Sequence, residues 1–224
     1  METATMKAMI LAAGRGERMR PLTDTTPKPL LKINQHRLIE HHIFNLKTAG
    51  ITELVINTAW LAEQIHQHLG DGFHYGVNIQ YSDEGEALET GGGINKALPL
   101  LGDDYFLVVN GDVWCDYNFD ALPSLQAEHL AHLVLVNNPE QHPGGDFSID
   151  KGLLSNNDAE KKTYSGIGLF RPEFFSDQSE KRFPLAPLLR EAADNQKITA
   201  ELYTGDWYDI GTPERLQQLK DKIN

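Results

Sequence analysis

The sequence predicts a single α/β domain in which a mixed, mostly parallel sheet is flanked by helices. Short apolar runs alternate with helical patterns between residues 7 and 109, as in crossover units that make neighbouring strands parallel. The chain has 224 residues, a length that one hydrophobic core can accommodate. No internal repeat, low-complexity tract or long linker divides it. We therefore expect one domain over residues 1–224, with residues 1–5 as a flexible N-terminal extension.

The first half of the chain alternates between strand and helix signals. Residues 7–12 (KAMILA) form a buried strand, and the loop at 14–29 contains Pro21, Pro27 and Pro29, which exclude one regular helix. Residues 38–49 have apolar side chains at helical spacing and end at Gly50, a typical C-terminal cap. Further strands are expected at 54–57, 77–81 and 105–109, and further helices at 61–69 and 94–101, the last interrupted by Pro99.

The regular alternation of strand and helix signals does not continue in the second half of the chain. We expect a strand at 133–136, loops or a hairpin at 138–158, a strand at 164–170, a helix at 186–193, a strand at 198–203 and a helix at 213–223 that has Pro213 in its first turn. Ligands of open α/β sheets bind beyond the carboxyl ends of the strands. The loops after Ala12, Val109 and Ile210 are therefore the places to look for chemistry.

Charge and cysteine content exclude several kinds of partner. Lys and Arg total 20 and Asp and Glu total 32, so the formal charge is −12, which opposes binding to nucleic acids and anionic membranes. The single cysteine, Cys115, leaves no intrachain disulfide. No apolar run approaches the ~18–20 residues of a membrane span, and residues 1–5 do not resemble a signal peptide. We expect a cytoplasmic protein, with Met6 as an alternative start to Met1.

A glycine-rich, basic loop follows the first strand. Residues 14–37 contain six basic and two acidic side chains, a local charge of +4 in an acidic chain. Backbone N–H groups of Gly14 and Gly16, together with these cations, suit a polyphosphate, although a solvated basic loop is the alternative. Met19 occupies the place of the third glycine of a dinucleotide-binding loop, and the Gly-Lys-Ser/Thr of a Walker loop is absent. These departures argue against a nicotinamide-dependent oxidoreductase.

The whole pattern resembles the signature of sugar-1-phosphate nucleotidyltransferases. Residues 14–23 read Gly-x-Gly-x-Arg-Met-x-Pro-Leu-Thr, and Pro-Lys-Pro follows at 27–29. Residues 85–94 (GEALETGGGI) and 109–114 (VNGDVW) are similar to the N-acetylmuramate α-1-phosphate uridylyltransferases of bacterial peptidoglycan recycling within that family. The resemblance covers nearly the whole chain. It implies a Rossmann-like enzyme, monomeric or a small homo-oligomer, that uses UTP or another NTP and a sugar 1-phosphate.

Two aspartates are candidate metal ligands. Asp112 lies in an Asn-Gly-Asp turn after a predicted strand, where a carboxylate can bind Mg²⁺, although such a segment alone is more often an ordinary turn. Asp209 lies in residues 207–213 (WYDIGTP), which end another expected strand and open the final helix, and alone it would be an ordinary acid at a strand end. The resemblance implies that Asp112 and Asp209 together hold Mg²⁺. It also implies Lys28 as the cation at the reacting phosphates and Arg18 as the group that stabilises departing pyrophosphate.

The resemblance also implies the residues that bind each substrate. The nucleotide is expected to contact Glu84, Glu89 and Thr90 and the first loop at Leu11, Ala12, Ala13, Gly14, Arg15 and Gly16. A carboxylate only accepts hydrogen bonds, so Glu84 suits the N–H of uracil or guanine and disfavours cytosine. The three glycines at 91–93, ahead of the expected helix, would let a ligand approach the backbone. For the sugar, the expected residues are Asn110, Gly145, Ser165 and Gly166.

Several activities remain open at this point. The family's usual Glu-Lys-Pro segment before the glycine-containing strand is missing, which argues against an ordinary hexose substrate without identifying muramate. Mannose-1-phosphate guanylyltransferase and glucose-1-phosphate thymidylyltransferase are alternatives with the same chemistry. A non-catalytic nucleotide-sugar sensor is the alternative from another class, and it predicts the loss of Lys28 or Asp112, both of which are present.

Overall fold

The structure is a computed structural model that describes residues 6–157, 160–176 and 178–223 of the chain. The expected flexible extension at 1–5 lies outside the described residues, and so does the first of the two candidate start positions.

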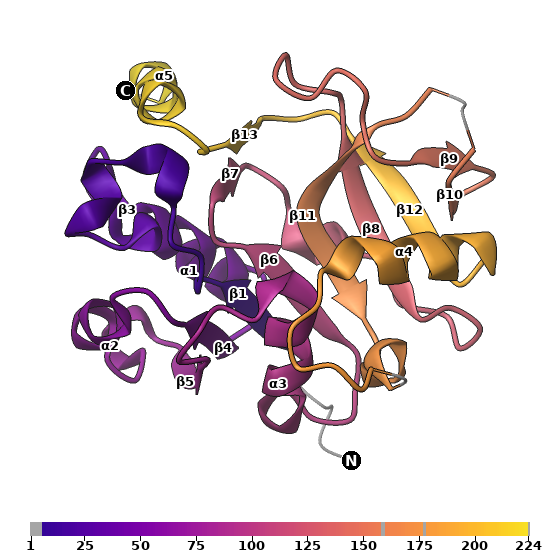
Figure 1. The fold of residues 1–224 in the computed structure, drawn as a ribbon, viewed down its shortest axis with the longest axis horizontal. Helices are drawn as coiled ribbons and strands as arrows, with labels where there is room; N and C mark the ends of the chain where they lie inside the picture. The colour runs from indigo at the N-terminus through magenta and orange to yellow at the C-terminus, as the bar shows by residue number, and fades with distance from the viewer. Residues whose placement is uncertain (1–5, 158–159, 177, 224) are drawn as a thin grey trace.

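One nine-stranded sheet runs through the molecule (Figure 1). Its strands, in their order across the sheet, are β5 (Asn78–Asp83), β4 (Glu53–Thr58), β1 (Lys7–Leu11), β6 (Phe106–Asn110), β11 (Thr163–Phe170), β8 (Ala131–Val136), β12 (Ile198–Tyr203), β10 (Leu153–Ser155) and β9 (Ser148–Asp150). Strands β10 and β11 run opposite to the others. The predicted class, a mixed and mostly parallel sheet, is confirmed.

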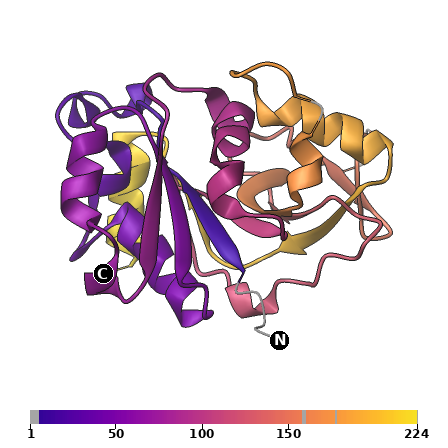
Figure 2. The same cartoon turned by 90° about the horizontal axis from the view of Figure 1, so that it is seen from below.

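Helices cover both faces of this sheet (Figure 2). Helices α1 (Leu38–Thr48) and α2 (Ala62–Leu69) lie on one face, where Ile43 and Ile65 share a buried cluster with Ile10 of β1. Helices α3 (Glu89–Leu101) and α4 (Leu185–Asp194) lie on the other, where Ile94 packs with Met9. Successive strand residues point to opposite faces, so the continuous apolar runs of β1 and β6 serve both layers. No helix in the described ranges has the length and apolar composition needed to cross a membrane.

A smaller assembly of short strands and one helix packs beside the main sheet. Helix α5 (Pro213–Lys222) joins the ribbon of β7 (Val113–Cys115) and β13 (Trp207–Asp209) and the hairpin of β2 (Lys32–Ile33) and β3 (His36–Arg37). Met19, Leu38, Ile210 and Leu219 form its buried core. Pro213 begins α5, as predicted, and the Thr212 hydroxyl caps it. The strand expected ahead of the last helix is present as β13. The sequence patterns did not reveal its pairing with β7 or the β2–β3 hairpin, because strands of two or three residues are too short to show periodicity.

Residues 14–29 contain only short 3₁₀ turns: η1 (Glu17–Met19), η2 (Leu22–Asp24) and the start of η3 (Lys28–Leu30). The prolines thus have the predicted effect. The expected hairpin within 138–158 is also present as β9 and β10.

The start of α3 differs from the prediction. The helix begins at Glu89 rather than at residue 94, and Pro99 lies in its last turn without interrupting it. The three glycines are therefore helical, and all three are buried. A Cβ at Gly91 would lie 2.5 Å from the Phe183 ring, and one at Gly92 would lie 2.4 Å from the Lys181 carbonyl oxygen. The glycines admit neighbouring protein rather than a ligand, which corrects our interpretation of them.

Candidate active site

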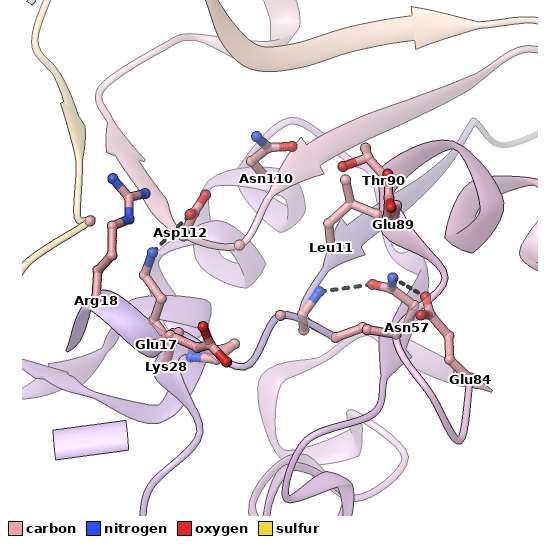
Figure 3. Close-up of a pocket in the computed structure, with 18 residues that line it drawn as sticks. Leu11, Glu17, Arg18, Lys28, Asn57, Glu84, Glu89, Thr90, Asn110 and Asp112 are labelled. Carbon is pink, nitrogen blue, oxygen red and sulfur yellow. Dashed lines mark hydrogen bonds and ion pairs between the residues drawn. The ribbon is translucent and has the colours of Figure 1, made fainter. Parts of the chain in front are cut away.

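A cavity of about 460 Å³ opens beyond the carboxyl ends of β1, β4 and β6 (Figure 3). Leu11, the last residue of β1, pairs in register with Asn57 of β4 on one side and with Asn110 of β6 on the other. The rest of the lining comes from the loop after β1, the turn after β6, the start of α3 and the segment before α5. The loops expected to carry chemistry therefore meet at one edge of the sheet, where β1 has a parallel neighbour on each side.

Lys28 and Asp112 form an ion pair on one side of the cavity. The Lys28 Nζ atom lies 2.8 Å from Asp112 Oδ2, although the two residues are 84 positions apart. The Lys28 side chain is only 9% exposed, whereas the Asp112 side chain is 41% exposed. A buried ammonium group needs an anionic or polar partner, and a phosphate can provide one as well as a carboxylate. The arrangement is suited to an anionic ligand that shares Lys28 with Asp112.

Two residues of the motif, Gly16 and Thr23, fix the shape of the glycine-rich loop. Gly16 has a φ of +66°, and its carbonyl oxygen accepts a hydrogen bond of 2.7 Å from the Thr23 hydroxyl. The Arg15 guanidinium group lies 4.4 Å from the ring centroid of Trp60, a cation–π contact that directs it away from the cavity lining. Arg18 and Glu17 do line the cavity. Of the predicted basic groups, Arg18 and Lys28 therefore reach it and Arg15 does not.

The β7–β13 ribbon brings the two candidate metal ligands together. Asp209 ends β13 opposite Val113 of β7, and the Ile210 N–H donates to the Asp112 carbonyl oxygen at 2.9 Å. Residues 112 and 209 are thereby neighbours across the ribbon. The Asp209 carboxylate also accepts a hydrogen bond from Arg215.

Gly211 leaves room for this charged cluster. A Cβ there would lie 2.8 Å from Arg215 Nη1, 3.1 Å from Asp209 Oδ1 and 3.3 Å from Arg18 Nη1. Asp112 and Gly211 line the cavity, and Asp209 lies two residues before Gly211 in the chain. Asp112 lines the cavity and Asp209 adjoins it across the ribbon, which fits the preference of Mg²⁺ for one or two protein carboxylates plus substrate oxygens.

The opposite side of the cavity is built by a buried amide–carboxylate pair. The Asn57 Nδ2 group donates to Glu84 Oε1 at 2.6 Å, and Glu84 Oε2 accepts from the Leu88 N–H at 2.8 Å. The Ala12 N–H donates to Asn57 Oδ1 at 2.8 Å, so this N–H is already satisfied within the protein. Figure 3 shows Asn57 and Glu84 across the cavity from Lys28 and Asp112.

Glu89 and Thr90 line the same side, at the first turn of α3. Glu89 has a φ of +62°, a left-handed conformation that costs free energy for a residue with a side chain. Its Oε1 atom lies 3.3 Å from Arg182 Nε. A strained residue at a cavity wall is typical of a ligand-binding position.

The predicted sugar residues are only partly brought together. Asn110 lines the cavity, and Gly166, with a φ of +84°, packs so closely on it that a Cβ would lie 2.6 Å from Asn110 Cγ. The Ser165 hydroxyl is buried and donates to the Val134 carbonyl oxygen at 2.7 Å. Gly145 packs against Asn138 and Lys161. The lining of the described cavity contains Asn110 but none of Gly145, Ser165 and Gly166.

Our interpretation of the sequence missed Asn57, Glu17 and Arg215. Asn57 carried a detectable signal, since residues 54–57 (LVIN) repeat the pattern of residues 107–110 (LVVN), whose asparagine was recognised. Both asparagines lie at the carboxyl ends of strands that flank β1, Asn110 as the last residue of β6 and Asn57 as the last but one of β4. Glu17 and Arg215 have no comparable signal, because acidic and basic residues are common on exposed loops and helices.

Two buried groups near β7 have no direct role in the cavity. Burial lowers the pKa of His42 to about 4, and its hydrogen bond to the Val113 backbone partly opposes this. Burial also raises the pKa of the Cys115 thiol to about 11, so the thiolate is scarce at neutral pH. Cys115 is a buried, packed residue.

Comparison with known proteins identifies the family. A family model described as "Nucleotidyl transferase" matches residues 7–147, which extend from β1 to the residue before β9. The chain belongs to the nucleotidyl transferase family.

Its relatives include proteins of a more specific description. The N-acetylmuramate alpha-1-phosphate uridylyltransferase of Neisseria meningitidis is 52% identical, with 96% of this chain and 97% of the relative aligned. The protein of the same description from Caulobacter vibrioides is 34% identical over 96% of this chain and 95% of its own length. HddC from Yersinia pseudotuberculosis, solved with GMP-PN, has a TM-score of 0.81 at 19% identity and covers 98% of this chain and all of its own. That structural likeness concerns the fold alone.

Proposed function

We propose that this protein transfers the uridylyl group of UTP to N-acetylmuramate α-1-phosphate, forming UDP-N-acetylmuramate and pyrophosphate. The observation that carries this proposal is the 52% identity to the Neisseria meningitidis uridylyltransferase over nearly the full length of both chains. The cavity supports it, because its cationic and hydrogen-bonding sides lie opposite each other at the ends of β1, β4 and β6. UTP is a nucleotide of the cell interior, so we place the reaction in the cytoplasm, within peptidoglycan recycling.

The reaction is an in-line displacement at phosphorus. An oxygen of the sugar phosphate attacks the α-phosphorus of UTP, and the bond from that phosphorus to the oxygen bridging the β-phosphate breaks. Pyrophosphate leaves with the bonding electron pair. The attacking oxygen is already ionised at neutral pH, so the protein needs no strong general base. Catalysis consists of positioning and charge neutralisation.

Lys28 and Arg18 supply the cationic groups. Lys28 is buried and held by Asp112, so its ammonium group is fixed beside the reacting phosphates. Arg18 is exposed at the cavity wall, close to the space that Gly211 leaves open, and we assign it to the departing pyrophosphate. Such fixed charges stabilise the charge that develops in the transition state. Arg15 assists only if a ligand draws it from Trp60.

Asp112 and Asp209 would hold Mg²⁺, in keeping with their carboxylate chemistry and their adjacency across the β7–β13 ribbon. When bound, the ion neutralises phosphate charge and helps to orient the α-phosphate. Arg215 orients Asp209 from α5, and Lys28 holds Asp112.

The base is assigned to the side with Glu84, Glu89 and Thr90, and the ribose and phosphates to the backbone of residues 11–16. Glu84 uses one lone pair of each carboxylate oxygen within the protein, which leaves further acceptor capacity toward a base N–H. This favours uracil or guanine over cytosine. For the sugar we retain Asn110, Gly145, Ser165 and Gly166, with Asn110 as the member that already lines the cavity.

A panel of sugar 1-phosphates tests the proposal. The protein is incubated with Mg²⁺ and UTP, GTP or dTTP, together with the α-1-phosphate of N-acetylmuramate, N-acetylglucosamine, glucose or mannose, and pyrophosphate release is measured. We expect turnover with UTP and N-acetylmuramate α-1-phosphate to exceed every other pair. Exclusive use of mannose 1-phosphate with GTP would contradict the proposal, and no turnover with any pair would favour the sensor.

A further inference from the structure

Asn57 lies at the centre of the nucleotide side of the cavity, yet the proposed chemistry does not use it. It is 3% exposed, it lies one residue before the end of β4 in register with Leu11 of β1, and it lines the cavity. Its carboxamide connects three chain segments, since it accepts from Ala12 and donates to Glu84, which in turn accepts from Leu88.

The orientation of this carboxamide follows from its two neighbours. The Ala12 N–H can only donate, so the Asn57 oxygen must face it. The Asn57 amino group then faces Glu84, where an oxygen would oppose a carboxylate oxygen at 2.6 Å. The reverse orientation places donor against donor and acceptor against acceptor. Asn57 therefore holds the Glu84 carboxylate in one defined position.

The surrounding structure makes space for this pair and encloses it. A Cβ at Gly93 would lie 2.5 Å from Glu84 Oε1 and 2.9 Å from Asn57 Nδ2, so the third glycine of α3 is needed for the pair to form. Glu84 is 9% exposed, and the hydrogen bonds recorded for its carboxylate come from two neutral groups, the Asn57 amide and the Leu88 N–H. Because a buried carboxylate without a cationic partner relies on its hydrogen-bond donors, the loss of either donor makes its burial markedly less favourable.

We propose that Asn57 is a positioning residue that sets the base selectivity of the nucleotide site by holding Glu84 as a hydrogen-bond acceptor toward the base. The proposal rests on the proposed function. Uracil presents an N–H at its pairing edge where cytosine presents an acceptor, so a fixed carboxylate binds one and repels the other. Without Asn57 the Glu84 carboxylate is no longer held in place. The ratio of the CTP to the UTP dissociation constant then falls by a larger factor than kcat does.

The test uses Asn57→Asp and Asn57→Ser. Asp places a second carboxylate against Glu84, and Ser removes both side-chain hydrogen bonds without adding charge. Dissociation constants for UTP and CTP are measured by calorimetry with Mg²⁺, and KM and kcat by pyrophosphate release. We expect the ratio of the CTP to the UTP dissociation constant to fall at least about tenfold in both variants, as for a site that loses its specific hydrogen-bond partner. KM for UTP should rise by more than kcat falls.

Asn57→Asp combined with Glu84→Gln provides a rescue. The exchanged pair again offers one amide and one carboxylate, so each of the three hydrogen bonds regains a donor and an acceptor. The double variant should bind UTP at least about threefold more tightly than Asn57→Asp alone, a coupling that independent sites do not show.

Asn78→Asp is the matched control. Asn78 of β5 donates to Glu53 of β4 at 2.8 Å, which is also an amide–carboxylate pair, but at an exposed position outside the cavity. The control should leave UTP selectivity unchanged. Unchanged selectivity in folded Asn57→Asp or Asn57→Ser, or a double variant that binds UTP no better than Asn57→Asp, would overturn the proposal. A wild-type protein that prefers GTP contradicts the uridylyl assignment alone, and the same variants are then compared with GTP and CTP.

Discussion

At the scale of the residue, the site depends on charged groups that the fold brings together at the cavity and beside it. Lys28 is nearly buried, and its partner Asp112 is partly open to the cavity. Arg18 and Arg215 converge with Asp209 around the space left by Gly211. Ion pairs hold Lys28 with Asp112 and Arg215 with Asp209 before a substrate arrives, so little reorganisation of these groups is needed during the reaction.

Replacement of Lys28 by Met should lower turnover by at least ~10², the loss expected for one electrostatic stabiliser. Met has a similar length and no charge, so the buried position remains filled while the ammonium group is lost. Lys32→Met, at an exposed position in β2, is the matched control. Turnover is measured by pyrophosphate release, and melting temperature confirms folding. Turnover of the Lys28 variant close to that of the control would reject the assigned role.

At the scale of the element, α3 is defined more by its neighbours than by its own propensity. Three consecutive glycines weaken an isolated helix. Here they allow the helix to approach residues 181–183, and the Gly92 N–H donates to the Phe183 carbonyl oxygen at 3.1 Å. In return, the Phe183 N–H donates to the Leu88 carbonyl oxygen at 3.2 Å. This segment therefore helps to form the first turn of α3, which lines the nucleotide side of the cavity.

Gly91→Ala should therefore destabilise the protein, although alanine is the better helix former. The added Cβ would lie 2.5 Å from the Phe183 ring, and overpacking of this kind costs about 1–3 kcal/mol of unfolding free energy. The control is Gly144→Ala, which has no atom within 4 Å of the added Cβ. Urea unfolding measures both variants. Equal or greater stability of Gly91→Ala would show that the segment around Phe183 yields easily.

At the scale of the whole molecule, the cavity lies between two separately packed parts of the fold. One is the sheet with its helices, which supplies Leu11, Asn57 and Asn110. The other is the α5 assembly, which lines the cavity with Gly211 and places Asp209 next to Asp112. A ligand that contacts both is expected to stabilise the folded chain as a unit.

Mg²⁺ and UTP together should raise the melting temperature. At a ligand concentration of 100 times the dissociation constant, the gain in unfolding free energy is about 2.7 kcal/mol. For a chain of this size that corresponds to roughly 5–10 °C. Differential scanning fluorimetry measures the shift, and EDTA should reduce it and abolish turnover. A shift and a turnover that persist in EDTA would argue against a metal at Asp112 and Asp209.

Acid should destabilise the protein through its buried histidines. His132 lies in β8 within the sheet, Thr199 contacts its Nδ1 atom at 2.8 Å, and burial lowers the pKa of the ring. The unfolded chain takes up a proton below pH ~6.5 that the folded chain refuses, so stability decreases as pH falls from that value.

His132→Gln should therefore make stability less dependent on pH. One such group contributes at most ~1.4 kcal/mol per pH unit, and His42 keeps part of the dependence through the same effect. Urea unfolding between pH 7 and pH 5 measures the slope of stability against pH. The control is His74→Gln, at an exposed position, and the inference fails if both variants change the slope equally.

The amino-acid sequence by itself determined the α/β class, most of the long elements and the identity of Arg18, Lys28, Asp112 and Asp209 as candidates. Short stretches of sequence are enough for these predictions, because both apolar periodicity and an uncommon motif can be recognised within a few neighbouring residues. Only the tertiary structure showed that Asp112 and Asp209 adjoin through a ribbon of three-residue strands, and that Arg15 stacks on Trp60.

The tertiary structure likewise decided the meaning of the glycines in α3 and the place of Asn57. A glycine in the sequence does not show which group packs against it. The residues that pack against Gly91 and Gly92 lie some ninety positions away, at 181–183. Asn57 and Asn110 end similar runs, but only the pairing of β4 and β6 on either side of β1 makes both of them neighbours of one cavity. Contacts between distant segments depend on strand order and register, which no short stretch of sequence contains.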